Sequence, residues 1–547
     1  MSQDIIIVGG GLAGLAAAHE AVQRGRRVLI LDQEGAQSLG GQAFWSLGGL
    51  FMVDTPEQRR MGIRDSHALA RGDWMGSAGF DRPEDETPRK WAEAYLDYAA
   101  GPMRADLKAI GMRWFPVVGW AERGGSLAAG HGNSVPRFHI TWGAGEGVVA
   151  PYVRLAQEAE AKGLLRFGFR HRVTGLTLTN GRVTGVSGDM LAPDSTRRGA
   201  STNREVTGSF EYEAESVILT TGGIGGNHDA VRAQWPTDRL GPAPKRMVAG
   251  VPDYVDGRMA QIAKQAGAGA INEDRMWHYT EGLANWDPIW PNHGIRVLPG
   301  PSSLWFDALG NRMEAPCLPG FDTLATLKRI LETGHDHSWF ILTQKIIEKE
   351  FALSGSEQNP DFVSGKLWEV LKTRTFAKGA HPCVEAFKEN GEDFVVAQSL
   401  DELIAGMNAL TPDTPLDPEH IRAQVEARDA QIANPFSKDA QITAIHGARA
   451  YRGDRLVRTA KPHRILDPLA GPLIAVRLNI LTRKSLGGLH TDLSSRVQRP
   501  DGTPFDGLFA AGEVAGFGGG GYHGYNALEG TFLGGCIFSG RAAGRES

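Results

Sequence analysis

Apolar and polar positions near the start of the chain predict a strand, a helix and a second strand. Residues 5–8 form a continuous apolar run, and residues 28–31 form another. Such runs are typical of parallel strands that are buried on both faces. Between them, apolar residues recur at helical spacing from Leu12 to about Gly25. The segment therefore predicts the start of a parallel α/β sheet.

Glycine and acidic positions add a binding chemistry to this unit. Gly9-x-Gly11-x-x-Gly14 directly follows the first strand, and Asp32 lies 23 positions after Gly9, at the tip of the second strand. This is the full context of a dinucleotide-binding turn, in which glycines allow close approach of a pyrophosphate and the acid accepts from a ribose hydroxyl. The predicted cofactor-binding residues here are Gly9, Gly11, Ala13, Gly14, Asp32 and Gln33.

The C-terminal segment has a similar arrangement. Residues 507–511 form a short apolar strand, and Gly512 and Glu513 follow at its tip. Four glycines at 518–521 come next, and helical spacing begins at about Thr531. A helix N-terminus offers backbone N–H groups and positive dipole to a ligand.

Two further glycine pairs distinguish between dinucleotides. They lie in residues 38–51, soon after the second strand. NAD enzymes with this opening seldom need them, whereas FAD lies extended and needs further close backbone approach at its second phosphate and ring system. The segment favours FAD, with a packed glycine loop as the alternative. Its candidate residues are Gly40, Gly41, Gln42, Ser46 and Gly48.

The middle of the chain changes in character. Residues 167–185 alternate between apolar and polar, and Asn180-Gly181 predicts a hairpin turn between two strands. Beyond about residue 270, the stretch 276–306 contains four tryptophans together with His278, Tyr279, His293 and Arg296. It indicates either a pocket for a bulky hydrophobic substrate or the aromatic core of a second domain. Residues 321–331 and 339–353 are predicted to be helical.

Length, charge and cysteines narrow the class of protein. The 547 residues allow two or more domains, and the net charge of −5 gives no indication of a nucleic-acid partner. Three cysteines lie far apart and lack metal-binding spacing. No signal peptide precedes the first strand, and no apolar run is long enough to span a bilayer. These observations predict a soluble cytoplasmic protein without a metal site.

Several of these segments resemble the fumarate reductase/succinate dehydrogenase flavoprotein superfamily, and more closely its 3-ketosteroid Δ1-dehydrogenase-like branch. The matching segments are VGGGLAGLAAA at 8–18, GGQAFWSLGG at 40–49, SVILTTGG at 216–223, LTRKSLGGLHTD at 481–492 and GLFAAGEVAG at 507–516. The resemblance implies a Rossmann-like α/β domain, built from a parallel sheet and a β-meander, that binds FAD. It also implies an inserted α+β capping domain. The expected boundaries are 1–269 and 475–547 for the FAD-binding domain and 270–474 for the cap.

The resemblance also implies roles for individual residues. Glu513 would bind the ribitol, Val173 would lie near the adenine, and a helix N-terminus at Phe532 and Leu533 would meet the pyrimidine edge of the flavin. Gln42 stands where succinate dehydrogenases have the histidine that carries the flavin, so non-covalent FAD is expected. The remaining cofactor-binding candidates are Gly222, Gly512 and Gly530.

Departures from these families narrow the substrate. Ala527 replaces the arginine that grips a carboxylate in fumarate reductases, and residues 313–319 lack their proton-delivering arginine. A dicarboxylate would leave two buried carboxylates unpaired, which argues strongly against it. Tyr522, followed by Gly524, fits the C-terminal tyrosine of ketosteroid dehydrogenases, whereas their cap tyrosine has no clean match.

The resulting hypothesis is an FAD-dependent dehydrogenase that acts on a CH–CH bond of a 3-ketosteroid or similar hydrophobic cyclic ketone. Tyr522 would polarise the carbonyl, His278, Tyr279 or His523 would take the proton, and a hydride would pass to the flavin. An unidentified electron acceptor would reoxidise the cofactor. The alternatives are an enone reductase for a non-dicarboxylate substrate and a flavin-binding redox carrier without small-molecule turnover.

Overall fold

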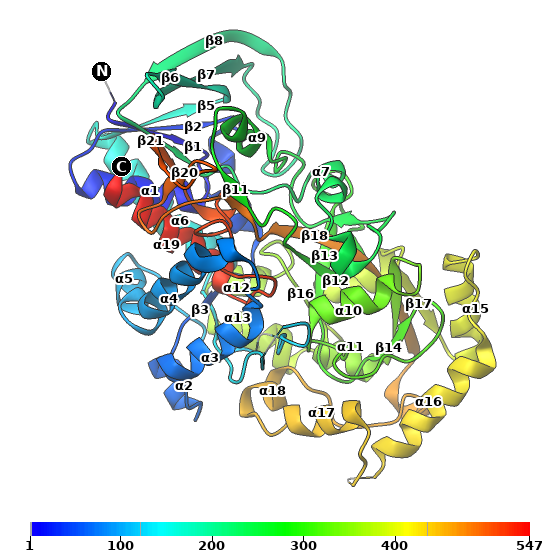
Figure 1. The fold of residues 1–547 in the computed structure, drawn as a ribbon. Coiled ribbons are helices and arrows are strands. Elements are labelled where there is room, and N and C mark those ends of the chain that lie inside the picture. The colour runs from blue at the N-terminus through cyan, green and yellow to red at the C-terminus, as the bar shows by residue number, and fades with distance from the viewer. Residues whose placement is uncertain (1–2, 121, 129, 435) are drawn as a thin grey trace.

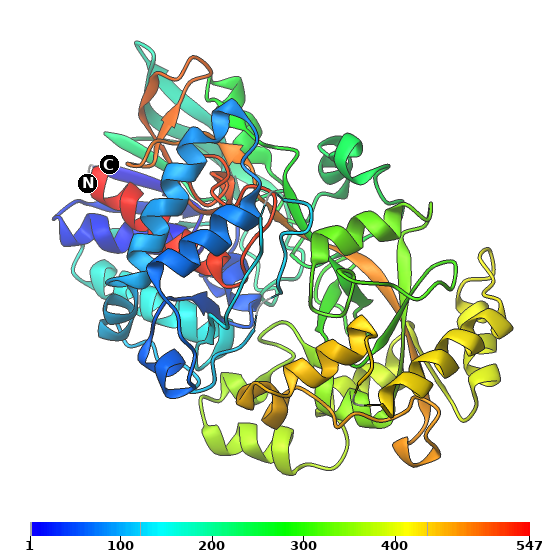
Figure 2. The ribbon, with the colours of Figure 1, turned by 60° about the horizontal axis from the view of Figure 1, so that its bottom comes forward.

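The computed structural model describes residues 3–120, 122–128, 130–434 and 436–547. The chain forms two domains that lie side by side (Figure 1). Both termini lie close together in the first domain, which therefore contains the two ends of the chain (Figures 1 and 2).

The first domain is built on a six-stranded sheet whose strand order is β20-β21-β9-β1-β2-β5. Five of its strands are parallel and β20 pairs antiparallel with β21. Their bounds are β1 Ile5–Val8, β2 Val28–Asp32, β5 Leu165–Phe169, β9 Ser216–Leu219, β20 Arg496–Gln498 and β21 Pro504–Ala510. The two predicted strands at the start of the chain and the strand predicted at 507–511 are confirmed.

Both faces of this sheet are covered, which explains the unbroken apolar runs. Ile5 and Ile7 of β1 face the layer that contains α1 (Leu12–Gln23), α6 (Ala144–Ala161) and α19 (Thr531–Glu546). Ile6 and Val8 face the opposite layer. That layer consists of β6 (His171–Thr179), β7 (Arg182–Leu191), β8 (Val206–Glu213) and α9 (Arg258–Gln265).

The predicted hairpin at Asn180-Gly181 is also confirmed. It joins β6 and β7, and β8 completes a three-stranded antiparallel meander. Asn180 and Gly181 have φ angles of 52° and 79°. Positive φ at both central residues is what a tight type I′ hairpin turn requires.

The second domain surrounds a mixed sheet with the path β14-β15-β18-β12-β13-β16, and β10 and β17 also pair with β18. The bounds are β10 Val248–Ala249, β12 Met276–Ala284, β13 Gly294–Leu298, β14 Leu304–Asp307, β15 His337–Thr343, β16 Ala352–Leu353, β17 Phe394–Ala397 and β18 Leu473–Ser485. The expected domain boundary at 474/475 falls inside β18, a buried strand that runs through this sheet before the chain returns to the first domain.

Helices cover this sheet, and the later ones, in yellow and gold in Figure 2, lie on the outside of the second domain. They are α10 Thr323–Leu331, α11 Gln344–Glu350, α12 Pro360–Val363, α13 Leu367–Leu371, α14 Pro382–Asn390, α15 Leu400–Leu410, α16 Pro418–Ile432, α17 Ala440–Ala448 and α18 Arg452–Val457. Those that complete the first domain and its border are α2 Pro56–Arg60, α3 His67–Ala78, α4 Glu86–Ala100, α5 Met103–Ala109, α7 His228–Ala233 and α8 Thr237–Leu240.

The helix predicted at 321–331 is confirmed as α10, but the helix predicted over 339–353 is wrong in its first part. Residues 337–343 form β15, and α11 begins only at Gln344. β15 lies between β14 and β18, and four consecutive residues in it are fully buried: Trp339, Phe340, Ile341 and Leu342. Because side chains on both faces of this strand are buried, its apolar run has no polar positions that would distinguish it from a helix. Short apolar runs are ambiguous between strand and helix when only the sequence is read.

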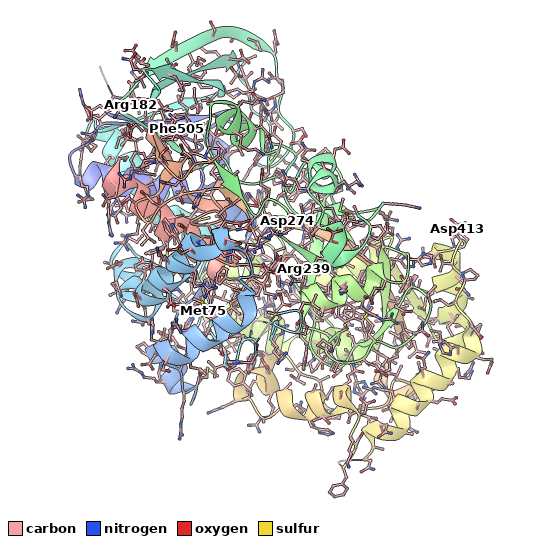
Figure 3. The ribbon with its side chains drawn as sticks, viewed as in Figure 1. Met75, Arg182, Arg239, Asp274, Asp413 and Phe505 are labelled. Atoms are coloured by element: carbon pink, nitrogen blue, oxygen red, sulfur yellow. The ribbon has the colours of Figure 1, made fainter. Side chains whose placement is uncertain are left out.

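Ion pairs connect the two parts of the chain near the start of β12. Arg82 binds Asp274 with N–O distances of 2.6 and 2.7 Å, and buried Arg275 binds Asp85 at 2.6 and 2.8 Å. Asp274 lies near the middle of the molecule, between the two domains (Figure 3). These contacts hold the second domain against the helices that follow residue 80.

Candidate functional site

A cavity of about 790 Å³ extends from the first glycine turn into the second domain. On one side it is lined by Gly9, Gly11 and Glu513, and on the other by residues such as Arg296 and Tyr451. Both domains therefore contribute to a single site.

The glycine turn after β1 leaves its backbone open to this cavity. Gly9 has a φ angle of 106°, and a Cβ atom there would lie 2.7 Å from the carbonyl oxygen of Thr220. A Cβ on Gly14 would lie 2.2 Å from the carbonyl oxygen of Gly9, so Gly14 allows α1 to pack tightly on the turn. The N-terminus of α1 then faces the cavity through Gly11.

Asp32 is fixed at the adjacent strand tip. Its carboxylate accepts hydrogen bonds from the backbone N–H groups of Gly10 at 2.8 Å and Glu34 at 2.9 Å. Burial raises the pKa of Asp32 to about 6. Each carboxylate oxygen keeps a further lone pair for a hydroxyl donor in the cavity.

Glu513 is the centre of a second set of polar contacts. Its carboxylate accepts from the backbone N–H of Ser485 at 2.9 Å and from the side-chain amide of Gln42 at 2.8 Å. Lys484 donates to Gln42 at 3.2 Å and lies 4.0 Å from Glu513. Burial lowers the pKa of Lys484 to about 8. The ammonium group also lies 5.8 Å from the ring of Phe532, at the start of α19, so a cation stands at that end of the helix.

All of the predicted cofactor-binding residues except Gly14 line this cavity. They are Gly9, Gly11, Ala13, Asp32, Gln33, Gly40, Gly41, Gln42, Ser46, Gly48, Val173, Gly222, Gly512, Glu513, Gly530, Phe532 and Leu533.

The cavity wall on the side of the second domain combines Tyr279, Arg296, Glu529 and Glu122. Arg296 donates to Glu529 at 2.6 Å, and its guanidinium carbon lies 3.6 Å from the centre of the Tyr279 ring. The more distant carboxylate of Glu281 lies 3.9 Å from Arg296. This arginine is therefore paired and also stacked on the tyrosine.

The hydroxyl group of Tyr279 has no hydrogen-bond partner among the described residues, and Tyr279 lines the cavity. Burial raises the pKa of Tyr279, and Glu529 raises it further, so the phenol keeps its proton at neutral pH. It can donate a hydrogen bond to a ligand.

Glu122 adds a buried carboxyl group to the wall. Burial raises the pKa of Glu122 well above the ordinary range, although Arg296 opposes this. One of its oxygens accepts from the backbone N–H of Thr323, and the other has no partner among the residues that the structure describes. A carboxylic acid held neutral in this way can donate a hydrogen bond.

A search of family models matches residues 4–533 to a family described as FAD binding domain. The chain belongs to this family. Its cofactor is FAD.

Individual relatives match the chain over nearly its whole length. The chain is 60% identical over 545 residues to a KsdD-like steroid dehydrogenase of Mycobacterium tuberculosis, covering all of this chain and 95% of that protein. Its structure resembles a 3-ketosteroid delta1-dehydrogenase of Sterolibacterium denitrificans with a TM-score of 0.66 at 15% identity, covering 99% and 98% of the two chains. It also resembles a 3-ketosteroid-delta4-(5alpha)-dehydrogenase of Rhodococcus jostii with a TM-score of 0.64 at 20% identity, covering 100% and 96%.

The residues of this flavoprotein fit FAD. The open glycine turn and the N-terminus of α1 suit the pyrophosphate, and Asp32 has acceptor capacity for the adenosine ribose. Glu513, held by Gln42 and Ser485, would accept from a ribitol hydroxyl, and Lys484 would supply positive charge to a flavin bound beside it.

Three of the four predicted catalytic residues do not line the cavity. Tyr522 and His523 belong to a buried aromatic cluster with Trp74, Tyr95 and Phe517. The Tyr522 hydroxyl donates to the carbonyl of Thr531 at 2.5 Å, and the His523 ring lies 2.8 Å from the Thr531 hydroxyl. The Tyr522 hydroxyl and His523 Nε2 thus have partners inside the protein, whereas His523 Nδ1 is buried without a partner among the described residues.

His278 is placed similarly. It stacks on Trp235, and its ring accepts from the backbone N–H of Arg483 at 3.2 Å. Burial lowers the pKa of His278 to about 3, so it stays neutral. Of the predicted catalytic residues, only Tyr279 lines the cavity.

The tryptophan-rich stretch 276–306 contributes differently from the predicted aromatic pocket. Trp277, Trp290 and Trp305 are buried in the protein core, Trp286 is largely exposed, and none of the four lines the cavity. The alternative of an aromatic core is the better description of this stretch.

The polar residues of the cavity that the sequence does not single out as site residues include Glu122, Arg296, Lys484 and Glu529. Arg296 stood out only as one donor among aromatics. Glu122 lies in a segment without periodicity, and Glu529 follows Ala527 in the motif that was compared with fumarate reductases. No local pattern joins residues so far apart along the chain.

Proposed function

We propose that this flavoprotein is a dehydrogenase that oxidises a CH–CH bond next to a carbonyl group in a 3-ketosteroid or similar hydrophobic cyclic ketone. The observation that carries the proposal is the hydroxyl of Tyr279, which lines the cavity and has no hydrogen-bond partner among the described residues. The similarity to KsdD-like steroid dehydrogenases supports the substrate class.

The lining of the cavity suits a large apolar molecule. Apolar side chains from both domains line it: Phe115, Val117, Phe138, Ile140, Leu298, Phe321, Phe362, Val370 and Leu371. Two arginines there are already neutralised, Arg296 by Glu529 at 2.6 Å and Arg374 by Asp361 at 2.5 Å. An uncharged substrate with a few polar groups fits the apolar part of this lining.

Tyr279 and Glu529 have different roles in the proposed reaction. The Tyr279 hydroxyl donates to the carbonyl oxygen, which stabilises negative charge there and makes the neighbouring C–H more acidic. Glu529, which accepts from Arg296 at 2.6 Å, takes that proton. Arg296 acts as a positioning residue, because it fixes both the phenol ring and the carboxylate. FAD, when bound, supplies the two-electron acceptor for the hydride from the next carbon.

We also propose that FAD is bound non-covalently. Gln42, whose amide contacts Glu513 and Lys484, is not a nucleophile that could carry the flavin. Acid precipitation of the purified protein should therefore release the flavin into the supernatant. Flavin that stays with the precipitate would contradict this.

An anaerobic titration tests the reaction. A 3-oxo-4-ene steroid added to the purified yellow protein should bleach the visible flavin band, and mass spectrometry should detect the 1,4-diene. If the band does not change, the flavin is reduced with dithionite and the dienone is added. Reoxidation would show a reductase, and no change in either direction would contradict the steroid assignment.

The variant Tyr279→Phe tests the named hydroxyl. It keeps the ring stacked on Arg296, and loss of one preorganised donor should slow flavin reduction by about 100- to 1000-fold. The matched control is Tyr451→Phe, since Tyr451 also lines the cavity but already donates to the carbonyl of Val118. Equal rates in Tyr279→Phe and the wild type would remove Tyr279 from the mechanism.

A further inference from the structure

An exposed aromatic surface lies on the outside of the cavity wall in the second domain. Residues 367–376 form one continuous helical segment, in which α13 is followed by a π-helical turn from Lys372 to Phe376. Trp368 is 64% exposed and Phe376 is 65% exposed, and their ring centres lie 6.1 Å apart. Leu367, at 47% exposed, extends this surface. Figure 2 shows the yellow-green helices of this region at the edge of the molecule.

The opposite side of the same segment lines the cavity. Val370, Leu371, Arg374 and Thr375 all belong to the lining. Thr375 is exposed as well, so the cavity reaches the surface beside the exposed aromatic rings. One helical segment therefore separates an apolar cavity from an apolar outer surface.

The charge around these rings has one dominant sign. Lys366, Lys372 and Lys378 are exposed, and none of the three forms an ion pair with a described residue. Within residues 364–379 the only acidic residue is Glu369, although the whole chain has a net charge of −5. Exposed Trp, Phe and Leu flanked by lysines are typical of segments that lie in the headgroup region of an anionic membrane.

We propose that Leu367, Trp368 and Phe376, with Lys366, Lys372 and Lys378, form a lipid-docking surface that binds an anionic bilayer. The rings enter the boundary between headgroups and acyl chains, and the lysines contact lipid phosphates. Docking there places the opening beside Thr375 at the lipid surface, where a hydrophobic substrate is concentrated. This surface does not depend on the proposed reaction, because any apolar ligand of the cavity would use the same route.

The structure of the described residues agrees with surface contact rather than insertion across the bilayer. No helix among them is both long enough and apolar enough to cross a membrane. The contribution of the three lysines to vesicle binding should fall as the salt concentration rises, since exposed charges are screened over about 8 Å at physiological ionic strength.

Vesicle co-sedimentation of the purified holoprotein tests the proposal. The wild type should sediment with phosphatidylcholine vesicles that contain phosphatidylglycerol, and much less with phosphatidylcholine alone. Replacing all three lysines by Gln should weaken binding to the anionic vesicles by about 100-fold, at roughly five-fold per lysine. The double variant Trp368→Ala/Phe376→Ala should weaken it by about ten-fold or more.

Matched variants and a second measurement separate the outcomes. Phe436→Ala removes a phenylalanine that is 87% exposed outside this surface, and it should bind vesicles like the wild type. Flavin content and thermal melting check that each variant is folded. Equal binding by the wild type and the double variant would overturn the proposal. So would a wild-type dimer in analytical ultracentrifugation that the double variant converts to monomer without any vesicle binding, since a second copy would then cover the surface.

Discussion

The cavity wall and the aromatic cluster each contain a buried tyrosine, but the two hydroxyl groups have different surroundings. In the aromatic cluster, the Tyr522 hydroxyl donates to the carbonyl of Thr531 at 2.5 Å. In the cavity wall, the Tyr279 hydroxyl has no partner among the described residues, although the ring is fixed by Arg296 at 3.6 Å. The two tyrosines are therefore buried to a similar extent, but only the hydroxyl of Tyr279 is available to a ligand.

The difference shows how a protein separates structural from reactive polar groups. A buried donor with an internal acceptor contributes to stability, because losing the partner leaves a polar group unsatisfied. A buried donor without an acceptor costs stability, and a ligand can restore the missing hydrogen bond. The cavity wall should therefore control reaction rate, and the aromatic cluster should control stability.

The largest expected effect on this comparison comes from Arg296→Met. The substitution leaves Glu529 and Glu281 buried without their cation, which should lower the free energy of unfolding by about 3–5 kcal/mol. Flavin reduction should slow as well, since Glu529 and Tyr279 lose their common partner. Thermal melting and stopped-flow reduction measure the two effects.

Arg154→Met is the control for loss of an arginine. Arg154 pairs with Glu158 on the exposed side of α6, so its removal should cost less than about 1 kcal/mol. If Arg296→Met were no less stable than this control, the ion pairs would not hold the cavity wall together.

Tyr522→Phe should have a smaller effect, on stability alone and not on the rate of flavin reduction. The carbonyl of Thr531 loses a donor inside the aromatic cluster, and the free energy of unfolding should fall by about 1–3 kcal/mol. Flavin reduction by substrate should stay within a few-fold of the wild type, because Tyr522 does not line the cavity. A large loss of rate without loss of stability would reverse the assignment of the two tyrosines.

The first domain was largely predictable from the sequence because its signals are local. Strands that are covered on both faces give unbroken apolar runs, such as Ile5–Val8, and the glycine turns lie beside them. The meander was predictable for the same reason, since its hairpin needs Asn180-Gly181 at the turn.

The cavity wall was predictable only in part because it is assembled from distant segments. The packing of the second domain on the first brings together Glu122, Tyr279, Arg296 and Glu529. Their spacing along the sequence does not predict that they lie in one cavity. The sequence also could not show that Tyr522 meets the carbonyl of Thr531, which lies nine residues later. A tyrosine beside glycines has the same pattern whether or not its hydroxyl finds an internal acceptor.

The smallest expected effect is a change of stability with pH that depends on the proton of Glu122 in the cavity wall. Burial raises the pKa of this carboxyl in the folded state, so the folded protein keeps a proton that the unfolded chain has already released above about pH 4.5. Wild-type stability should then fall as pH rises from this unfolded pKa towards the folded one, by at most about 1.4 kcal/mol per pH unit. Glu122→Gln carries no such proton, so its stability relative to wild type should rise by up to about 1.4 kcal/mol between about pH 6 and pH 7. Thermal melting at both pH values measures the change, with exposed Glu86→Gln as the control that should show none. A constant difference would mean that Glu122 is ionised in the folded protein and is a third carboxylate partner of Arg296 rather than a neutral donor.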